Sequence, residues 1–213
     1  MPCLLWYDNV CHIEIAGLTL EKSGLLLLTY TGKPVSIHNT MITVLVRDCN
    51  QISQSFYDSV LNELQLHQLT CSCGHSSCLS VHGYYERSVK MDEGTLRLRI
   101  CRVRCSACDA THAILLSSIV PYSQISLADQ QRICQDYETG NDTCGICGDH
   151  LSIDENNVKS VLRNYRRYWR QKLISLRICL SPLTGLVFSC FSFYSSQFMQ
   201  IRRRSNRLFS YTT

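Results

Sequence analysis

The end of this sequence has no acidic side chain: the last carboxylate is Glu155, and 11 lysines and arginines follow it. Residues 1–155 hold the other 10 basic residues and all 17 acidic ones. Such an asymmetry indicates a polyanionic partner. A solvated basic helix is the alternative, although solvated faces usually mix Glu with Lys. The asymmetry also argues against a complete two-metal nuclease domain, which needs three acidic residues to hold its metal ions.

Long apolar runs are missing as well. The longest leucine run covers residues 25–28, far short of the roughly 20 apolar residues that a membrane-spanning helix needs. The N-terminus lacks the charged start, apolar stretch and cleavage site of a signal peptide. Thiols that are not exported should stay reduced. We therefore expect a soluble, cytoplasmic protein with no membrane partner.

What the chain does have is cysteine, 14 residues in all. Some of them form two close pairs separated by a hairpin-length stretch, which is typical of a zinc ribbon with a tetrahedral Zn²⁺ site. Gly74 favours its neighbour Cys73 as a ligand, because a turn at a metal site commonly needs a residue that adopts positive φ. The predicted ligands are Cys73, Cys78, Cys105 and Cys108, with Cys71 as a substitute in the first pair. Ordinary buried thiols are the alternative.

Three histidines flank the predicted pairs: His75, His82 and His112. A histidine could replace a thiolate or carry a proton near the metal. More often such residues donate hydrogen bonds to the ligands.

An arginine-rich strand is predicted over residues 96–104. Apolar and basic residues alternate along it until Ile100 and Cys101, where the alternation slips by one residue. A β-bulge at that point would return all the arginines to one face, where they would suit a phosphate backbone. These residues are Arg97, Arg99, Arg102 and Arg104. An edge strand that uses charge to prevent aggregation is about equally compatible with the pattern.

The predicted fold class is α+β, with a small antiparallel zinc ribbon followed by a helical region that resembles a helix-turn-helix. Residues 1–40 are an unassigned extension, 41–69 a strand and helix, 70–121 the ribbon, 122–180 the helical region and 181–213 a basic tail. Capping boxes at residues 126–129 and 152–155 open two of the helices. A short helix over 142–150 should lie between them, although Gly145 and Gly148 weaken it.

The helix after Glu155 is the most regular segment. Its apolar residues recur every three or four positions, so one side should be buried. A neighbouring stripe is basic and can face phosphates: Lys159, Arg163, Arg166, Arg167 and Arg170. The two nearest the helix start, Lys159 and Arg163, are expected to reach bases.

Three segments carry a family resemblance: Cys73-Gly-His-Ser-Ser-Cys-Leu-Ser-Val-His-Gly-Tyr-Tyr-Glu-Arg87, Arg102-Val-Arg-Cys-Ser-Ala-Cys-Asp-Ala-Thr-His-Ala113 and Val120-Pro-Tyr122. They resemble a bacterial, transposase-associated zinc-ribbon family of unknown function, and more distantly the N-terminal zinc-binding domain of insertion-sequence transposases. The resemblance runs from residue 41 to residue 204. It implies zinc ligation by Cys105 and Cys108 with two of Cys71, Cys73 and Cys78, and DNA contact by the helices that follow.

We therefore expect a zinc-stabilised DNA-binding protein that is not an enzyme: the recognition part of a transposition system, or a regulator derived from one. RNA binding is a further option, because zinc ribbons serve it too. The alternative from another class is an adaptor that docks onto a separate transposase subunit. Its anchors would be Tyr165, Tyr168 and Trp169, which would then be partly exposed.

Overall fold

The structure is a computed structural model that describes residues 25–26, 41–46, 50–150, 152–194 and 197–200. The expected N-terminal extension lies outside the described residues, apart from positions 25 and 26. The arginines at 202, 203, 204 and 207 lie outside them too. Within the described part the fold is α+β, as predicted.

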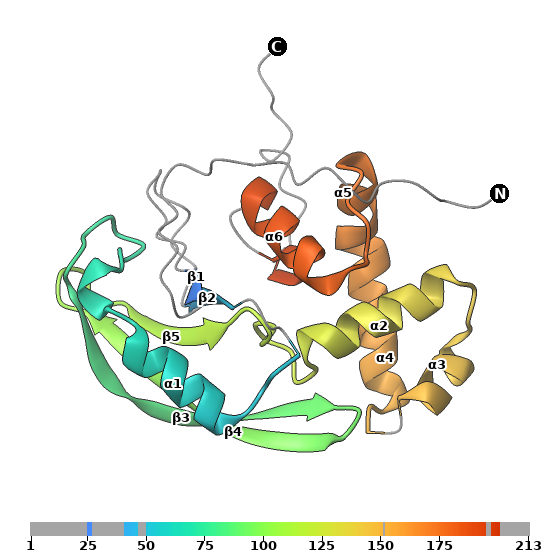
Figure 1. The fold of residues 1–213 in the computed structure, drawn as a ribbon, viewed down its shortest axis with the longest axis horizontal. Coiled ribbons are helices and arrows are strands. Elements are labelled where there is room, and N and C mark those ends of the chain that lie inside the picture. Colours follow the sequence, from blue (N-terminus) through green and yellow to red (C-terminus); the bar gives the residue numbers. More distant parts are fainter. Residues whose placement is uncertain (1–24, 27–40, 47–49, 151, 195–196, 201–213) are drawn as a thin grey trace, which may run out of the picture.

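A mixed sheet forms the first part of the molecule (Figure 1). Its strand order is β1 (Leu25–Leu26), β2 (Met41–Val46), β5 (Thr111–Leu116), β4 (Gly94–Cys105) and β3 (Leu79–Met91). The strands β3, β4 and β5 pair antiparallel, as expected for this segment, whereas β2 runs parallel to β5. The zinc ribbon itself stays a prediction. The three buried residues at the end of β2 explain the position of that strand, since an uninterrupted apolar run suits a strand covered on both faces.

A buried phenol links helix α1 (Gln54–Glu63) to two strands of the sheet. Ser53 caps the helix by accepting a hydrogen bond from the backbone N–H of Phe56. Tyr57 is buried, and its hydroxyl donates to the carbonyl of Ile114 (3.0 Å) and accepts from the N–H of Cys101 (2.8 Å). Because these partners lie on β5 and β4, α1 is held across two strands.

The β-bulge predicted at Ile100 and Cys101 is wrong. The pairing of β3 with β4 is continuous from Met91–Gly94 to Gly83–Arg102, and the irregularity lies in the other strand, between Val81 and Gly83. Ile100 and Cys101 are adjacent and both fully buried, so both faces of the sheet are covered there. This double burial, not a bulge, causes the slip in the sequence pattern.

The helical part begins with α2 (Leu127–Glu138), which Ser126 caps and which stops at Gly140, where φ is +97°. The short predicted helix is present as α3 (Thr143–Asp149). Helix α4 (Glu155–Asn164) starts as expected, although its cap is Asp154 and not Ser152. It continues through a π-helical turn (Tyr165–Trp169) into α5 (Arg170–Ser175), so a nearly continuous helix runs from residue 155 to 175.

The described part of the segment predicted to be a basic tail, residues 181–194 and 197–200, contributes to the core. Helix α6 (Leu183–Tyr194) contains no charged residue and buries four side chains, and a 3-10 turn (Phe198–Gln200) follows. The ring of Phe198 meets that of Trp169 edge to face, with centroids 5.6 Å apart. Gln200 donates to the hydroxyl of Thr43 on β2 (2.9 Å), which connects this end of the chain to the sheet.

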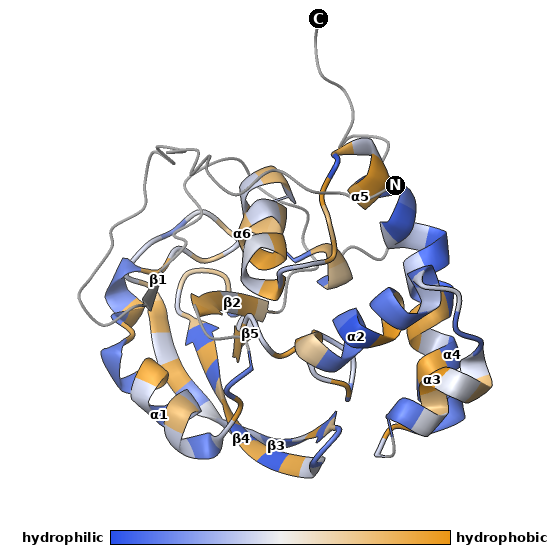
Figure 2. Cartoon of the chain, turned by 45° about the vertical axis from the view of Figure 1, so that its right-hand side comes forward, coloured by the Kyte–Doolittle hydropathy of each residue, from blue (hydrophilic) through white to orange (hydrophobic). Residues whose placement is uncertain are grey.

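Two hydrophobic clusters result. One lies between α1 and the sheet, and the other joins the helices α2 to α6. In Figure 2, polar and apolar residues alternate along β3 and β4, whereas α6 is largely apolar. None of the helices in the described ranges has the length and apolar character to cross a membrane.

Candidate functional site

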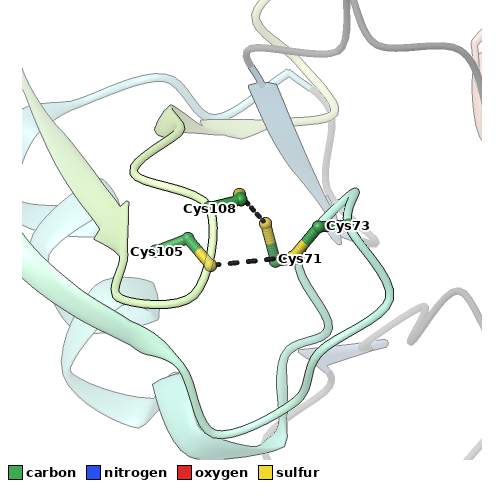
Figure 3. Close-up of side chains that lie close together, drawn as sticks. All are labelled: Cys71, Cys73, Cys105 and Cys108. Carbon is green, nitrogen blue, oxygen red and sulfur yellow. Dashed lines mark hydrogen bonds between the residues drawn. The ribbon is translucent and has the colours of Figure 1, made fainter.

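Four thiols meet between two turns of the chain. The sulfurs of Cys71, Cys73, Cys105 and Cys108 all lie within 4.8 Å of one another (Figure 3). Cys71 is 3.6 Å from Cys108, and Cys73 is 3.8 Å from Cys105. Zinc–sulfur bonds of about 2.3 Å in a tetrahedron place the sulfurs about 3.8 Å apart. The group could therefore hold a metal ion.

Backbone hydrogen bonds shape both turns. In the first, the N–H of Cys71 donates to the carbonyl of His75, and the N–H of Gly74 donates to the carbonyl of Cys71 (2.9 Å each). Gly74 has a φ of +89°, which confirms the expectation that this glycine adopts positive φ. In the second, Cys105 donates to Ala110 and accepts from Asp109. The sulfurs of each turn are therefore placed by the backbone.

Cys78 lies beside this group. Its sulfur is 3.3 Å from that of Cys105 and 3.1 Å from the carbonyl of His75. The structure thus groups Cys71 with Cys73, although the sequence predicted Cys71 only as a substitute ligand. Cys78, which was predicted to be a ligand, is not in the group. The physical reason is that the first tight turn closes between Cys71 and His75, so Cys78 comes after the turn, directly before β3.

The electrostatics of the thiols differ. Hydrogen bonds from the backbone and the ring of His75 lower the pKa of Cys73 to about 6. Burial and the neighbouring Cys105 raise the pKa of Cys78 to about 11. Since metals bind the thiolate, Cys73 is the better prepared ligand at neutral pH.

Two of the three flanking histidines contact the thiols. The Nε2 atom of buried His112 is 3.2 Å from the sulfur of Cys71, and the Nδ1 atom of His75 is 3.4 Å from that of Cys73. His82 is exposed at the irregularity of β3. His112 and His75 can therefore stabilise thiolates by hydrogen bonding, as outer partners of a metal site commonly do.

The four arginines of β4 are all exposed, but they do not share a face. With the alternation of β4 unbroken, Arg97 and Arg99 lie on one face, and Arg102 and Arg104 lie on the other. The aromatic partners of two of these arginines also lie on opposite faces. Arg99 covers the ring of Tyr84 and Arg102 faces the ring of Tyr85, and these tyrosines are consecutive residues of β3. The single row of guanidiniums predicted from the sequence is not formed.

The basic stripe begins on α4 and continues through the π-helical turn to Arg170 on α5. It is exposed as far as Arg167, while the apolar residues Val158, Val161 and Leu162 of α4 are buried. Two cations of the stripe have carboxylate partners: Lys159 pairs with Glu155 (2.7 Å), and Arg170 with Glu138 (2.5 Å). Arg166 and Arg167 face the rings of Tyr137 and Tyr168. Within the described residues, Arg163 forms no ion pair.

The anchors required by an adaptor are largely inside the molecule. Trp169 is 2% exposed and Tyr165 is 3% exposed, and both belong to the helical core. Tyr168 is half-buried against the same core. These side chains therefore stabilise the fold and offer little surface for a partner.

Sequence reasoning missed a second cluster, where the turn between β3 and β4 meets the helices. Both ring nitrogens of buried His150 contact carboxylates, Nδ1 that of Asp92 (2.8 Å) and Nε2 that of Asp136 (3.2 Å). Arg132 bridges Asp92 (2.6 Å) and Asp129 (2.9 Å). Asp92, Asp129 and His150 are close enough to hold a metal ion, but Arg132 already supplies a cation between the carboxylates. No sequence spacing points to this cluster, because its members are far apart in the chain.

Comparison with known proteins adds one match. Residues 70–146 match the model of a domain of unknown function, DUF6431. The matched segment contains the four grouped thiols, Cys78 and α2, and it ends within α3, before the basic stripe of α4. No curated protein and no solved structure matches the chain. In its cysteine-bearing part, the chain is therefore similar to a domain family whose function is not known.

Proposed function

We propose that this chain is a zinc-stabilised DNA-binding protein. The observation that carries the proposal is the division of α4 into two sides, one buried in the helical core and one basic and exposed. A helix of this kind is supported from behind and can present its cations to a groove lined by phosphates.

Zinc is the metal that best suits the cysteine group. Four thiolates form a closed tetrahedral set, the usual environment of structural zinc, with no open position for a substrate. The ligands would be Cys71, Cys73, Cys105 and Cys108. When bound, the ion would link the two turns and supply part of the folding free energy of this end of the sheet.

DNA would be held mainly through its phosphates. The cations of the stripe without a carboxylate partner in the described part of the chain are Arg163 on α4 and, on the π-helical turn, Arg166 and Arg167. Lys159 and Arg163, near the start of α4, are the residues proposed to reach base edges. The helices α2, α3 and α4 would then act in the manner of a helix-turn-helix, with α4 in the groove.

We further propose a relation to transposition systems, as a recognition component or a derived regulator without strand-transfer chemistry of its own. The absence of any carboxylate after Glu155 supports this view. The ion pairs of Arg132 with Asp92 and Asp129 support it too. Carboxylates that already bind an arginine are poorly suited to bind catalytic metal ions. A separate transposase subunit would supply the chemistry.

The test is a salt titration of DNA affinity on purified protein of known zinc content. If the three arginines of the stripe without a carboxylate partner each neutralise a phosphate, the logarithm of the association constant should fall with the logarithm of salt concentration with a slope of about −2.7 or steeper. Removing zinc with a chelator should unfold the cysteine turns, as seen by circular dichroism. An affinity for duplex DNA that does not change with salt would contradict the proposal.

A further inference from the structure

A groove lies between α1 and the β3–β4 hairpin, on the side of the sheet that carries Arg97 and Arg99. Its volume is about 480 Å³, within the range of roughly 300–1,000 Å³ typical of small-ligand sites. Its lining residues come from α1 and from the facing strands β3 and β4. The proposed DNA-binding helix α4 takes no part in it.

The groove contains a flat, preformed stack. The Tyr84 ring is 46% exposed, and the guanidinium carbon of Arg99 lies 4.1 Å from its centroid. Gln54 holds the backbone of Arg99 by accepting a hydrogen bond from its N–H (2.7 Å) and donating one to its carbonyl (3.4 Å). Unpaired bases stack on such aromatic rings and on guanidinium planes.

The charges of the groove favour a neutral base over a phosphate. Arg97 and Arg99 are balanced by Asp58 and Glu86, so the lining carries no net charge. Carboxylates repel a phosphate, but they accept hydrogen bonds from the N–H groups of a base edge. The amide of Asn62 offers both a donor and an acceptor. Leu61, which is partly buried, supplies apolar surface beside the ring.

We propose that this groove binds one unpaired base of single-stranded DNA, with Tyr84 and Arg99 as the stacking platform. The proposal rests on the proposed DNA-binding function and adds a ligand class to it. Duplex DNA would contact the cations of α4, while a melted or overhanging strand would place a base against β3 and β4.

The experiment measures the affinity of zinc-loaded, full-length protein for a labelled oligothymidylate and for a duplex of the same length. Tyr84→Ala should weaken oligothymidylate binding by roughly 5- to 150-fold, the cost of losing one stacked base, and leave duplex affinity unchanged. Arg99→Gln keeps the backbone bonds to Gln54 and should also weaken single-strand binding. The matched control is Tyr122→Ala, because Tyr122 is 66% exposed and lies outside the groove.

The outcomes separate this inference from the proposed function. If Tyr84→Ala lowers single-strand affinity no more than Tyr122→Ala, or if the wild-type protein binds duplex DNA alone, the groove proposal is overturned and the function of α4 stands. If the wild-type protein binds neither form, both proposals fall. A preference for oligouridylate over oligothymidylate would contradict the proposal that the ligand of the groove is DNA, and would indicate RNA instead.

Discussion

The sulfur of Cys78 lies 3.3 Å from the sulfur of Cys105, closer than Cys73 or Cys71 comes to its partner across the thiol group. Yet Cys78 is not among the four thiols that lie mutually close. Its sulfur is turned toward the carbonyl of His75, and its pKa is raised to about 11 by burial and by Cys105. A protonated Cys78 thiol that donates its one hydrogen to the carbonyl of His75 can support the first turn without ligating a metal.

This difference predicts the zinc content of two serine variants. Cys71→Ser should lose stoichiometric zinc because it removes a ligand, whereas Cys78→Ser should retain it. Inductively coupled plasma mass spectrometry of the purified variants makes the measurement. Cys179→Ser is the control, since Cys179 is exposed and far from the cysteine turns in sequence. If Cys78→Ser loses zinc and Cys71→Ser keeps it, the ligand set is Cys73, Cys78, Cys105 and Cys108 instead.

The basic stripe of α4 should divide into DNA-binding and structural residues. Arg163 is exposed and unpaired within the described residues, so Arg163→Ala should weaken duplex binding and reduce the salt slope by about 1. Arg170 holds Glu138 with two nitrogens (2.5 and 3.2 Å). Arg170→Ala should leave the slope nearly unchanged and lower the free energy of unfolding only slightly, because an ion pair at the surface stabilises little. Equal effects of the two variants on the salt slope would show that this division is wrong.

Local patterns predicted much of the fold. The caps and periodicity of the helices between residues 126 and 175 were sufficient to place three of them, because Ser126, Gly140 and the apolar repeat after Glu155 act through neighbours in sequence. The pairing of β3 with β4 follows likewise from alternation and a short turn. The parallel contact of β2 with β5 is not encoded locally, since its partners are about 70 residues apart.

The candidate site was predictable in kind but not in detail. The second cysteine turn follows from the spacing of Cys105 and Cys108, and the structure includes both in the thiol group. The choice between Cys71 and Cys78 depends on which residues close a backbone turn, and three cysteines within eight residues do not reveal that. The bulge prediction failed because Ile100 and Cys101 are buried on opposite faces, and burial by distant segments cannot be read from alternation alone.

The ion-pair cluster around His150 predicts a pH dependence of stability. Burial lowers the pKa of His150, but hydrogen bonds and charge from Asp92 and Asp136 outweigh it, so the pKa is raised above 6.5. Arg132 and Asp129 are the other charged groups of the cluster. A raised folded-state pKa means that the stabilisation is complete below the unfolded value of about 6.5 and is lost as pH rises through the folded value.

Urea unfolding followed by circular dichroism at a series of pH values measures this effect. The midpoint of the wild-type protein should fall as pH rises above about 6.5. His150→Asn should be less stable at low pH and should show a flatter profile over the same range. A wild-type profile that is parallel to that of His150→Asn would show that the imidazole does not carry the dependence.

The last prediction concerns residues 183–194 and 197–200, which the sequence analysis assigned to a tail and which bury side chains in the helical core. Phe198 is buried against Trp169, and Phe193, five residues earlier on α6, is 52% exposed. Phe198→Ala should therefore lower the free energy of unfolding by about 3–5 kcal/mol, the usual cost of emptying a buried aromatic site. Phe193→Ala should change it by no more than about 0.5 kcal/mol. Both variants remove the same side chain, so a difference between their free energies of unfolding, measured by chemical unfolding, reports the effect of burial alone. Similar, small losses in both would mean that residues 197–200 do not pack on the π-helical turn, and that α4 is supported without them.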